Sequence, residues 1–200
     1  MLFRSVSTLT SPVAHNRVLT GILGMHKVDV LLTGVGMVPT AAWTTRALAI
    51  GGYDLAVNLG VCGSFNPDLA IGSVVHVVSE SLPEAGAEDG ETFLSLQQLG
   101  LLNDDEFPWT SGRLVNIQPP PIPALQALPE VAGITVNTAH GHEPSIAALL
   151  QRTPADVESM EGAGFMYACL LAGVPFVEIR AISNRVERRN RAAWDLKGAI

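Results

Sequence analysis

The side chains best suited to chemistry lie together in one stretch of the chain, residues 157–184. Glu161 follows a methionine at the start of an apolar segment, and Arg180 and Asn184 lie towards the end of the next one. A carboxylate can stabilise positive charge that develops in a reaction, while a guanidinium or an amide can hold a polar substrate. Because apolar runs rarely carry charged side chains without partners, this combination predicts a ligand site.

Each of these three side chains also has a purely structural interpretation. Glu161, taken alone, is more typical of an acid that complements the dipole of a helix start. Arg180 could form an ion pair with Glu178 or with Glu161, and Asn184 could be a turn residue that closes a strand. Only their occurrence together favours a site over these structural roles.

Two consecutive elements must position these side chains. Residues 162–172 carry apolar side chains at helical spacing, and the following Gly-Val-Pro sequence predicts the end of that helix. Residues 174–183 predict a buried strand, and its alternation places Glu178, Arg180 and Asn184 on one face. An acid at a helix start beside polar side chains at the carboxyl end of a strand is typical of α/β ligand sites.

Two other apolar strands each run into a turn that contains glycine. One turn contains Gly36 and precedes a helix that we expect over residues 39–50; the other contains Val61, Cys62 and Gly63. Glycine lets a ligand approach the backbone closely, and a helix start adds partial positive charge. Since both turns follow strands, they predict one shared cleft at the carboxyl ends of the sheet.

The remaining segments predict the frame of an α/β domain. Apolar periodicity predicts strands over residues 28–33, 54–59, 72–80 and 133–138 and a helix over residues 145–152. The acidic, glycine-rich stretch 81–112 is expected to be a surface excursion with a short helix. The proline-rich stretch 119–123 predicts an extended connector.

Composition and charge exclude several classes of protein. The chain has 200 residues, of which 48% are hydrophobic and 16% charged, which is typical of a compact globule. The net charge of −7 argues against nucleic acid as a partner, because neutralising phosphates needs a basic face. The basic cluster at residues 185–191 suits a solvated segment and an anion-binding role about equally. No apolar run is long enough to cross a membrane.

The cysteines and histidines show no spacing typical of a metal site. Cys62 and Cys169 are the two cysteines, and both lie in apolar surroundings. Such thiols favour a reducing, cytoplasmic location over a disulfide scaffold. His140 and His142 lie in a glycine-containing loop, which suits substrate contact or surface exposure better than zinc binding.

The stretch 157–184 resembles the nucleoside phosphorylase and nucleosidase superfamily. It contains that superfamily's Met-Glu-Gly-Ala helix start and its Val-Pro-Phe strand, which ends in Arg-Ala-Ile-Ser-Asn. The run over residues 180–194, Arg-Ala-Ile-Ser-Asn-x-Val-Glu-x-Arg-Asn-x-x-x-Trp, is similar to the futalosine hydrolase family. The resemblance covers about residues 28–200. It implies an α/β fold, with a central mixed β-sheet flanked by helices in a single nucleosidase-like domain over residues 1–200.

The resemblance also implies an activity. Futalosine hydrolases cleave the N-glycosidic bond of futalosine to give hypoxanthine and dehypoxanthine futalosine, in menaquinone biosynthesis, and need no cofactor or metal. Two alternatives stay open: another purine nucleosidase, acting on inosine or a methylthio-nucleoside, or a non-catalytic nucleoside-binding protein. Because relatives complete their pockets across an interface, a homodimer or higher homo-oligomer is expected.

The same resemblance assigns roles to individual residues. Glu161 would bind the ribose hydroxyls and help to orient water, Arg180 would face this carboxylate, and Asn184 would take the departing base. An amide can donate to the O6 and N7 acceptors of a 6-oxopurine, whereas a carboxylate would repel them. The residues expected to bind substrate are Gly36, Val61, Cys62, Gly63, His140, Met160 and Ser183.

Two departures from the superfamily's pattern bear on these expectations. Phosphorolytic relatives grip phosphate with an arginine and a hydroxyl, but the matching positions here are Asn58 and Val61, which implies water as the nucleophile. Relatives also open with a strand followed by an acid, and no Asp or Glu precedes Asp29. We therefore expect the usual first strand and last helix to be lacking, either because the true ends lie further out or because the chain has lost them.

Overall fold

The computed structural model describes residues 2–4 and 18–199. Its strands are, in chain order, β1 (Leu2–Arg4), β2 (Val18–Leu23), β3 (His26–Leu31), β4 (Tyr53–Ser64), β5 (Val74–Ser81), β6 (Gly86–Asp89), β7 (Thr92–Ser95), β8 (Trp109–Thr110), β9 (Arg113–Val115), β10 (Glu130–Thr135), β11 (Val157–Ser159) and β12 (Phe176–Arg185). Its helices are α1 (Met37–Ile50), α2 (Glu143–Arg152), α3 (Gly162–Ala172) and α4 (Leu196–Ala199), with 3₁₀ turns η1 (Pro123–Ala127) and η2 (Arg191–Ala193).

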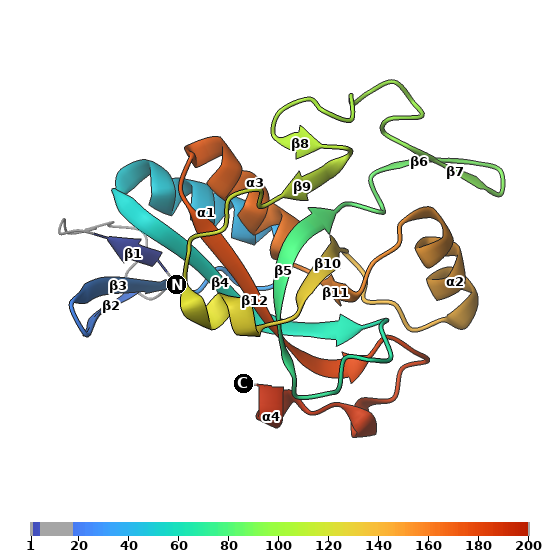
Figure 1. Ribbon diagram of the computed structural model, residues 1–200. Helices are drawn as coiled ribbons and strands as arrows, with labels where there is room; N and C mark the ends of the chain where they lie inside the picture. Colours follow the sequence, from blue (N-terminus) through green and yellow to red (C-terminus); the bar gives the residue numbers. More distant parts are fainter. Residues whose placement is uncertain (1, 5–17, 200) are drawn as a thin grey trace.

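Strands β4, β11, β10, β5 and β12 form a closed ring at the centre of the molecule (Figure 1). β12 closes this ring, because it pairs in parallel with β4 and antiparallel with β5. Beyond β4 the sheet continues through β1, β3 and β2, and beyond β5 it continues through β9 and β8. The ring contains three parallel and two antiparallel pairs, so the predicted mixed sheet is confirmed.

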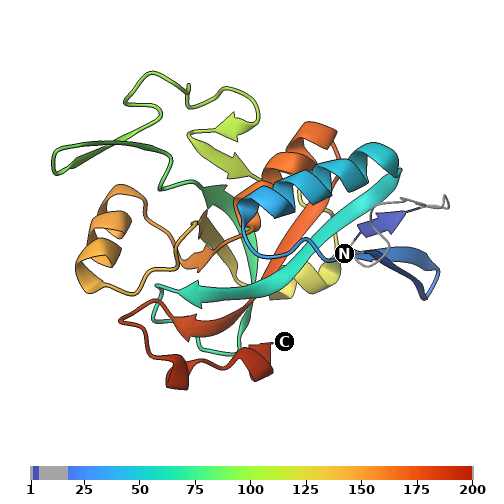
Figure 2. The same ribbon diagram turned by 180° about the vertical axis from the view of Figure 1, so that it is seen from behind.

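Helices flank this sheet as predicted. α1 and α3 pack side by side, and α2 lies away from them across the ring (Figures 1 and 2). Phe165, Met166 and Cys169 of α3 are buried in the main core, where Phe165 meets Phe176 of β12 edge to face. The helix ends at Gly173, whose φ of 64° lies in the left-handed region. The predicted bounds of α3 are confirmed.

The excursion between β5 and β9 contains no helix within residues 81–112, so that prediction is wrong. Gly90 and Gly100 interrupt this stretch with left-handed φ values of 62° and 68°, which a helix does not contain; β6 and β7 form a hairpin instead, with Gly90 in the turn. The excursion returns through Trp109, whose ring packs edge to face on Tyr167 of α3 at 6.1 Å. It is thus a set of turns and short strands tied back to α3.

Strand β12 contains a β-bulge close to the predicted site. Ile182 pairs with Cys62, but Asn184 pairs with Gly63, so the register steps by one residue at Ser183. The simple alternation that placed Asn184 on the face of Arg180 is therefore wrong beyond Ile182, because a bulge interrupts the two-residue period.

The expected lack of the family's usual first strand and last helix stays a prediction. β1 lies between β3 and β4, and residues 5–17, where the opening acid was sought, lie outside the described residues. At the other end, α4 is the last described helix and packs on β12. Within residues 2–4 and 18–199, no helix has the length and apolar character needed to cross a membrane.

Candidate active site

Glu161 lies immediately before α3, and its carboxylate reaches across to the start of α1. Its Oε1 accepts a hydrogen bond of 3.0 Å from the backbone N–H of Gly36. Gly36 has a φ of 99°, a conformation that side-chain-bearing residues rarely adopt, so a glycine is needed to aim this N–H at the carboxylate. The first glycine turn and the helix start, distant in sequence, are thereby brought together.

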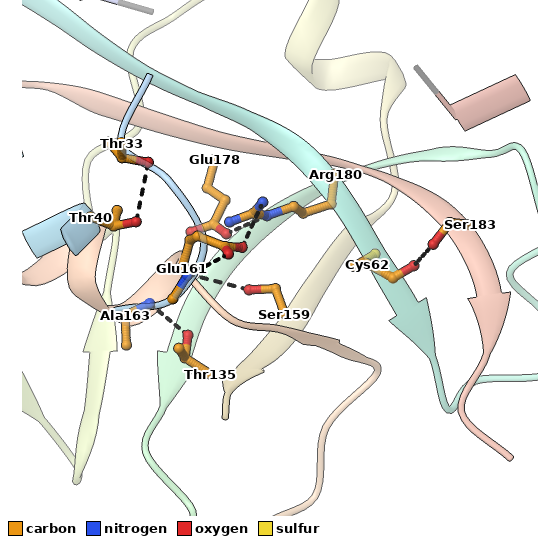
Figure 3. Close-up of polar contacts among 12 residues, drawn as sticks. Thr33, Thr40, Cys62, Thr135, Ser159, Glu161, Ala163, Glu178, Arg180 and Ser183 are labelled. Atoms are coloured by element: carbon orange, nitrogen blue, oxygen red, sulfur yellow. Dashed lines mark hydrogen bonds and ion pairs between the residues drawn. The ribbon is translucent and has the colours of Figure 1, made fainter. Parts of the chain in front are cut away.

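The start of α3 is capped by other residues. The N–H of Gly162 donates to Ser159 Oγ at 3.3 Å, and the N–H of Ala163 donates to Thr135 Oγ1 at 2.7 Å (Figure 3). Glu161 makes no side-chain capping bond to its own helix. The carboxylate of Glu161 therefore links the start of α3 to other elements. This argues against the interpretation that Glu161 only complements the helix dipole.

Arg180 of β12 points towards this carboxylate from within the ring (Figure 3). Its Nη1 lies 3.7 Å from Glu161 Oε2, while its Nε donates to Glu178 Oε1 at 2.8 Å. The Arg180 side chain is only 2% exposed, whereas that of Glu161 is 21% exposed and open to a ligand. A Cβ on Gly60 would lie 2.1 Å from Arg180 Nη1, so only glycine at this position leaves room for the guanidinium.

Ser183 and Asn184 form a second group, with Cys62 and Gly63 at the end of β4. The prediction of a turn at Val61, Cys62 and Gly63 is wrong, because pairing with β12 continues β4 as far as Ser64. Ser183 Oγ lies 3.2 Å from the carbonyl oxygen of Cys62 and 2.8 Å from Asn184 Oδ1, and can donate to either. Asn184 Nδ2 donates to the carbonyl of Arg185 at 2.8 Å. One of the two amide hydrogens of Asn184 is therefore used within the protein, and one is left for a ligand.

His140 is held by Glu158 of β11. Its backbone N–H donates to Glu158 Oε1 at 2.9 Å, and its Nδ1 lies 2.5 Å from Glu158 Oε2. Burial raises the pKa of the Glu158 carboxyl group, and its contacts with His140 partly offset this. Met160 is half-buried next to Glu161. No contact joins either His140 or Asn184 directly to Glu161 among the described residues.

Val61 differs from the other predicted substrate-binding residues. Its side chain lines a cavity of about 350 Å³ together with Leu59, Val74 and Ile179. None of the residues that contact Glu161 lines this cavity. Val61 thus lines a cavity that the contacts of Glu161 do not share, although the preceding Gly60 lies beside Arg180.

Sequence analysis missed two buried residues that lie beneath the start of α3. Glu80 at the end of β5 accepts a hydrogen bond of 2.8 Å from Thr135 Oγ1 and is 1% exposed. Thr135 in turn caps α3. The signal in the sequence was an acid that ends an apolar strand, but nothing local showed that β5 and β10 would meet at the start of α3.

Burial dominates the electrostatics of the ionisable groups around Arg180. It raises the pKa of Glu80 well above the ordinary value and also raises that of Glu178. For Arg180, burial acts to lower the pKa, but the facing carboxylates of Glu178 and Glu161 more than offset it and the pKa is raised. The guanidinium is therefore a permanent positive charge beside Glu161.

Thiol and metal chemistry find no support in the arrangement. Cys62 and Cys169 are both free and buried, and burial raises the pKa of Cys62 to about 12 and that of Cys169 further. Thiols of this kind are poor nucleophiles at neutral pH. In the described part of the chain, no three His, Cys, Asp or Glu side chains are grouped as metal ligands. The arrangement can instead place one carboxylate opposite developing positive charge.

Comparisons with known proteins bear on the family and the fold of the chain. A family model described as the phosphorylase superfamily matches residues 5–197. The futalosine hydrolase of Streptomyces coelicolor is 36% identical over 184 residues, which span 86% of this chain and 73% of that protein.

Solved structures show the same fold. The futalosine hydrolase of Helicobacter pylori superposes with a TM-score of 0.70 at 18% identity, covering 92% of this chain and 77% of that one. A 5'-methylthioadenosine/S-adenosylhomocysteine nucleosidase from Colwellia psychrerythraea, in complex with adenine, gives a TM-score of 0.71 at 21% identity, with 91% and 76% covered.

Proposed function

Because this chain belongs to the phosphorylase superfamily and, within it, to the futalosine hydrolase family, we propose that it hydrolyses the N-glycosidic bond of futalosine. The products are hypoxanthine and dehypoxanthine futalosine, as a step of menaquinone biosynthesis. The observation that carries the proposal is the partly exposed carboxylate of Glu161, held between the Gly36 N–H and the buried guanidinium of Arg180.

Glu161 has the position that the reaction requires. Cleavage of a glycosidic bond passes through an oxocarbenium-like state, in which positive charge builds on the ribose as the base leaves. The Gly36 N–H and Arg180 fix the carboxylate before substrate arrives, so little reorganisation is needed in the transition state. Met160, next in sequence, offers a flexible apolar surface to the sugar.

Asn184 is proposed to hold the departing base. With one amide hydrogen donated to the Arg185 carbonyl, the remaining hydrogen can reach either O6 or N7 of hypoxanthine, one at a time. The hydroxyl of Ser183 fixes the amide when it donates to Asn184 Oδ1. Gly36, Cys62, Gly63 and His140 complete the proposed lining on the ribose and base sides.

Water is the proposed nucleophile. A phosphate site needs charged or hydroxyl donors. At the two matching positions this chain has the neutral amide of Asn58, whose Nδ2 is buried without a partner among the described residues, and the aliphatic Val61, which lines the separate cavity described above. Among the described residues, the cation that contacts Glu161 is Arg180, and Glu178 and Glu161 already face it.

Turnover of a substrate panel tests the proposal. Purified protein is incubated with futalosine, inosine and 5'-methylthioadenosine, and the released base is measured by chromatography. The expected result is release of hypoxanthine from futalosine, with a much higher kcat/KM than for the other two. A preference for 5'-methylthioadenosine would favour the related nucleosidase activity, and binding of futalosine without turnover would favour a non-catalytic binding protein.

Assembly and location are proposed from exposed apolar side chains and from the two free thiols. Val35 and Val38 at the start of α1, and Leu171 of α3, expose apolar side chains that a second copy of the chain could cover, so a homodimer or higher homo-oligomer is proposed. The two free, buried thiols suit the cytoplasm. Light scattering after gel filtration measures the oligomeric state directly.

A further inference from the structure

Two buried carboxyl groups and one guanidinium meet at the start of α3. Glu80, Glu178 and Arg180 are 1%, 0% and 2% exposed. Arg180 Nε donates to Glu178 Oε1, and Thr135 Oγ1 donates to Glu80 Oε2. Among the described residues, Glu80 Oε1 and Glu178 Oε2 have no hydrogen-bond partner. A buried carboxylate oxygen left in this state is costly, so the ionised form of both groups does not fit the site.

Glycines leave the space in which the two carboxyl groups converge. A Cβ on Gly162 would lie 2.2 Å from Glu80 Oε1 and 2.7 Å from Glu178 Oε1. A Cβ on Gly133 of β10 would lie 2.4 Å from the same Glu80 oxygen. Gly162 directly follows Glu161, so both buried carboxyl groups lie beside the backbone that carries the proposed catalytic carboxylate.

The balance of charge around this pair favours one hydrogen between the two groups. Two ionised carboxylates that share a site repel each other, and one of them then keeps its hydrogen. Glu80 is the better candidate, because Arg180 bonds directly to Glu178 and not to Glu80. The charged and titratable groups that face the pair are Arg180 and Glu161, Arg113 of β9, Cys62 of β4 and Cys169 of α3.

We infer that Glu80 is a positioning residue for the proposed reaction: its carboxyl group holds a hydrogen against Glu178, and Glu178 then keeps the guanidinium of Arg180 turned towards Glu161. This inference rests on the proposed function. One hydrogen on Glu80 Oε1, donated to the carboxylate of Glu178 whose Oε1 converges with it beside Gly162, gives Glu80 Oε1 the partner that it otherwise lacks. When Glu80 loses this hydrogen, repulsion displaces Glu178, Arg180 follows it, and the contact with Glu161 is weakened.

Glu80→Gln separates this role from simple packing. The glutamine amide matches the shape of the protonated acid, can donate to Glu178 and accept from Thr135, and cannot lose its hydrogen at alkaline pH. We expect its kcat at neutral pH to stay within about threefold of wild type. The wild-type kcat falls at alkaline pH, and in Glu80→Gln this fall is absent or moved up by at least about one pH unit.

The measurement is kcat and KM for futalosine from about pH 6 to about pH 10, with base release as the readout. An identical alkaline limb in both proteins, or no alkaline fall in wild type, overturns the inference while leaving the proposed function intact. Absence of turnover by the wild-type protein at every pH overturns both. Glu130→Gln, an exposed change on β10, is the matched control and keeps the wild-type profile.

Glu178→Gln tests the second member of the pair. Removing the charge that holds Arg180 is expected to lower kcat at least about tenfold, with a smaller change in KM, because the guanidinium then loses its anchor. An unchanged kcat overturns the inference. Infrared spectroscopy of the folded wild-type protein, with glutamate carboxyl groups isotope-labelled, should detect a protonated glutamate at neutral pH. Its absence also overturns the inference, whether or not the variants fold.

Discussion

Among the described residues, the carboxylate of Glu161 contacts Gly36 and Arg180 on other elements and caps no N–H of its own helix. A carboxylate that serves only the helix dipole contributes roughly 0.3–1 kcal/mol and tolerates an amide. A carboxylate that stabilises a transition state contributes several times more, and only to the rate. A single substitution of Glu161 therefore separates the two roles, because a helix-dipole role affects stability and a catalytic role affects the rate.

Glu161→Gln is expected to lower kcat for futalosine by about 10²–10³, which corresponds to roughly 3–4 kcal/mol. The fold should be kept, because the amide is nearly isosteric and can still accept from Gly36. Steady-state kinetics and the thermal unfolding midpoint are measured together, with Glu130→Gln as the control. A loss smaller than about tenfold would return Glu161 to a structural role.

Asn184→Asp is expected to change the choice of base. A carboxylate at this position faces the O6 and N7 acceptors of hypoxanthine but can accept from a 6-amino group. The ratio of kcat/KM for the 6-oxo and 6-amino forms of one nucleoside should shift by at least about tenfold, or about 1.4 kcal/mol, towards the amino form. Competitive turnover of the two forms by both proteins gives this ratio, and an unchanged ratio would mean that Asn184 does not read the base.

At the scale of elements, glycines within strands matter where they leave room for particular side chains. Gly60 of β4 leaves the space that the Arg180 guanidinium occupies, and a Cβ there would lie 2.1 Å from Nη1. At Gly21 of β2, by contrast, an added Cβ would have no heavy atom within 4 Å. The two strand glycines therefore offer a matched pair.

Gly60→Ala is expected to displace Arg180, to lower kcat at least about tenfold and to destabilise the protein by about 1–3 kcal/mol, as overpacking does. Gly21→Ala should leave kcat unchanged. Kinetics and denaturant unfolding of both variants check this expectation. Equal kcat values for the two variants would show that Arg180 can be displaced without loss of activity and would contradict its proposed role.

The elements also show what sequence could predict. The bounds of α3 and the Met-Glu start were predictable, because helical spacing, a glycine stop and the family motif are all local. The closing of the ring by β12, and the meeting of Glu80 with the start of α3, depend on pairings between distant strands that no local pattern specifies. The bulge at Ser183 was likewise missed, since an alternating strand gives no sign of one extra residue.

For the whole molecule, the buried acids link stability to pH. The pKa of Glu80 is raised on folding, chiefly by burial. Above the ordinary carboxyl value of 4.5, the unfolded chain releases this hydrogen while the folded protein keeps it, so stability falls as pH rises. The loss continues until the pH reaches the raised pKa of the folded state.

Unfolding at about pH 5 and about pH 8 measures this linkage. The wild-type free energy of unfolding should fall more between these two values than that of Glu80→Gln, whose amide does not titrate. Other groups contribute equally to both proteins, so the difference isolates Glu80. Parallel pH dependences would show that Glu80 ionises normally in the folded protein.

The central claim is that this chain cleaves a nucleoside with water at the carboxylate of Glu161. The most direct measurement is the product analysis of futalosine turnover by the wild-type protein, with and without inorganic phosphate. The account predicts hypoxanthine and the free sugar product, dehypoxanthine futalosine, at a rate that does not depend on phosphate. A sugar 1-phosphate product, a rate that saturates with phosphate, or no release of hypoxanthine would contradict it.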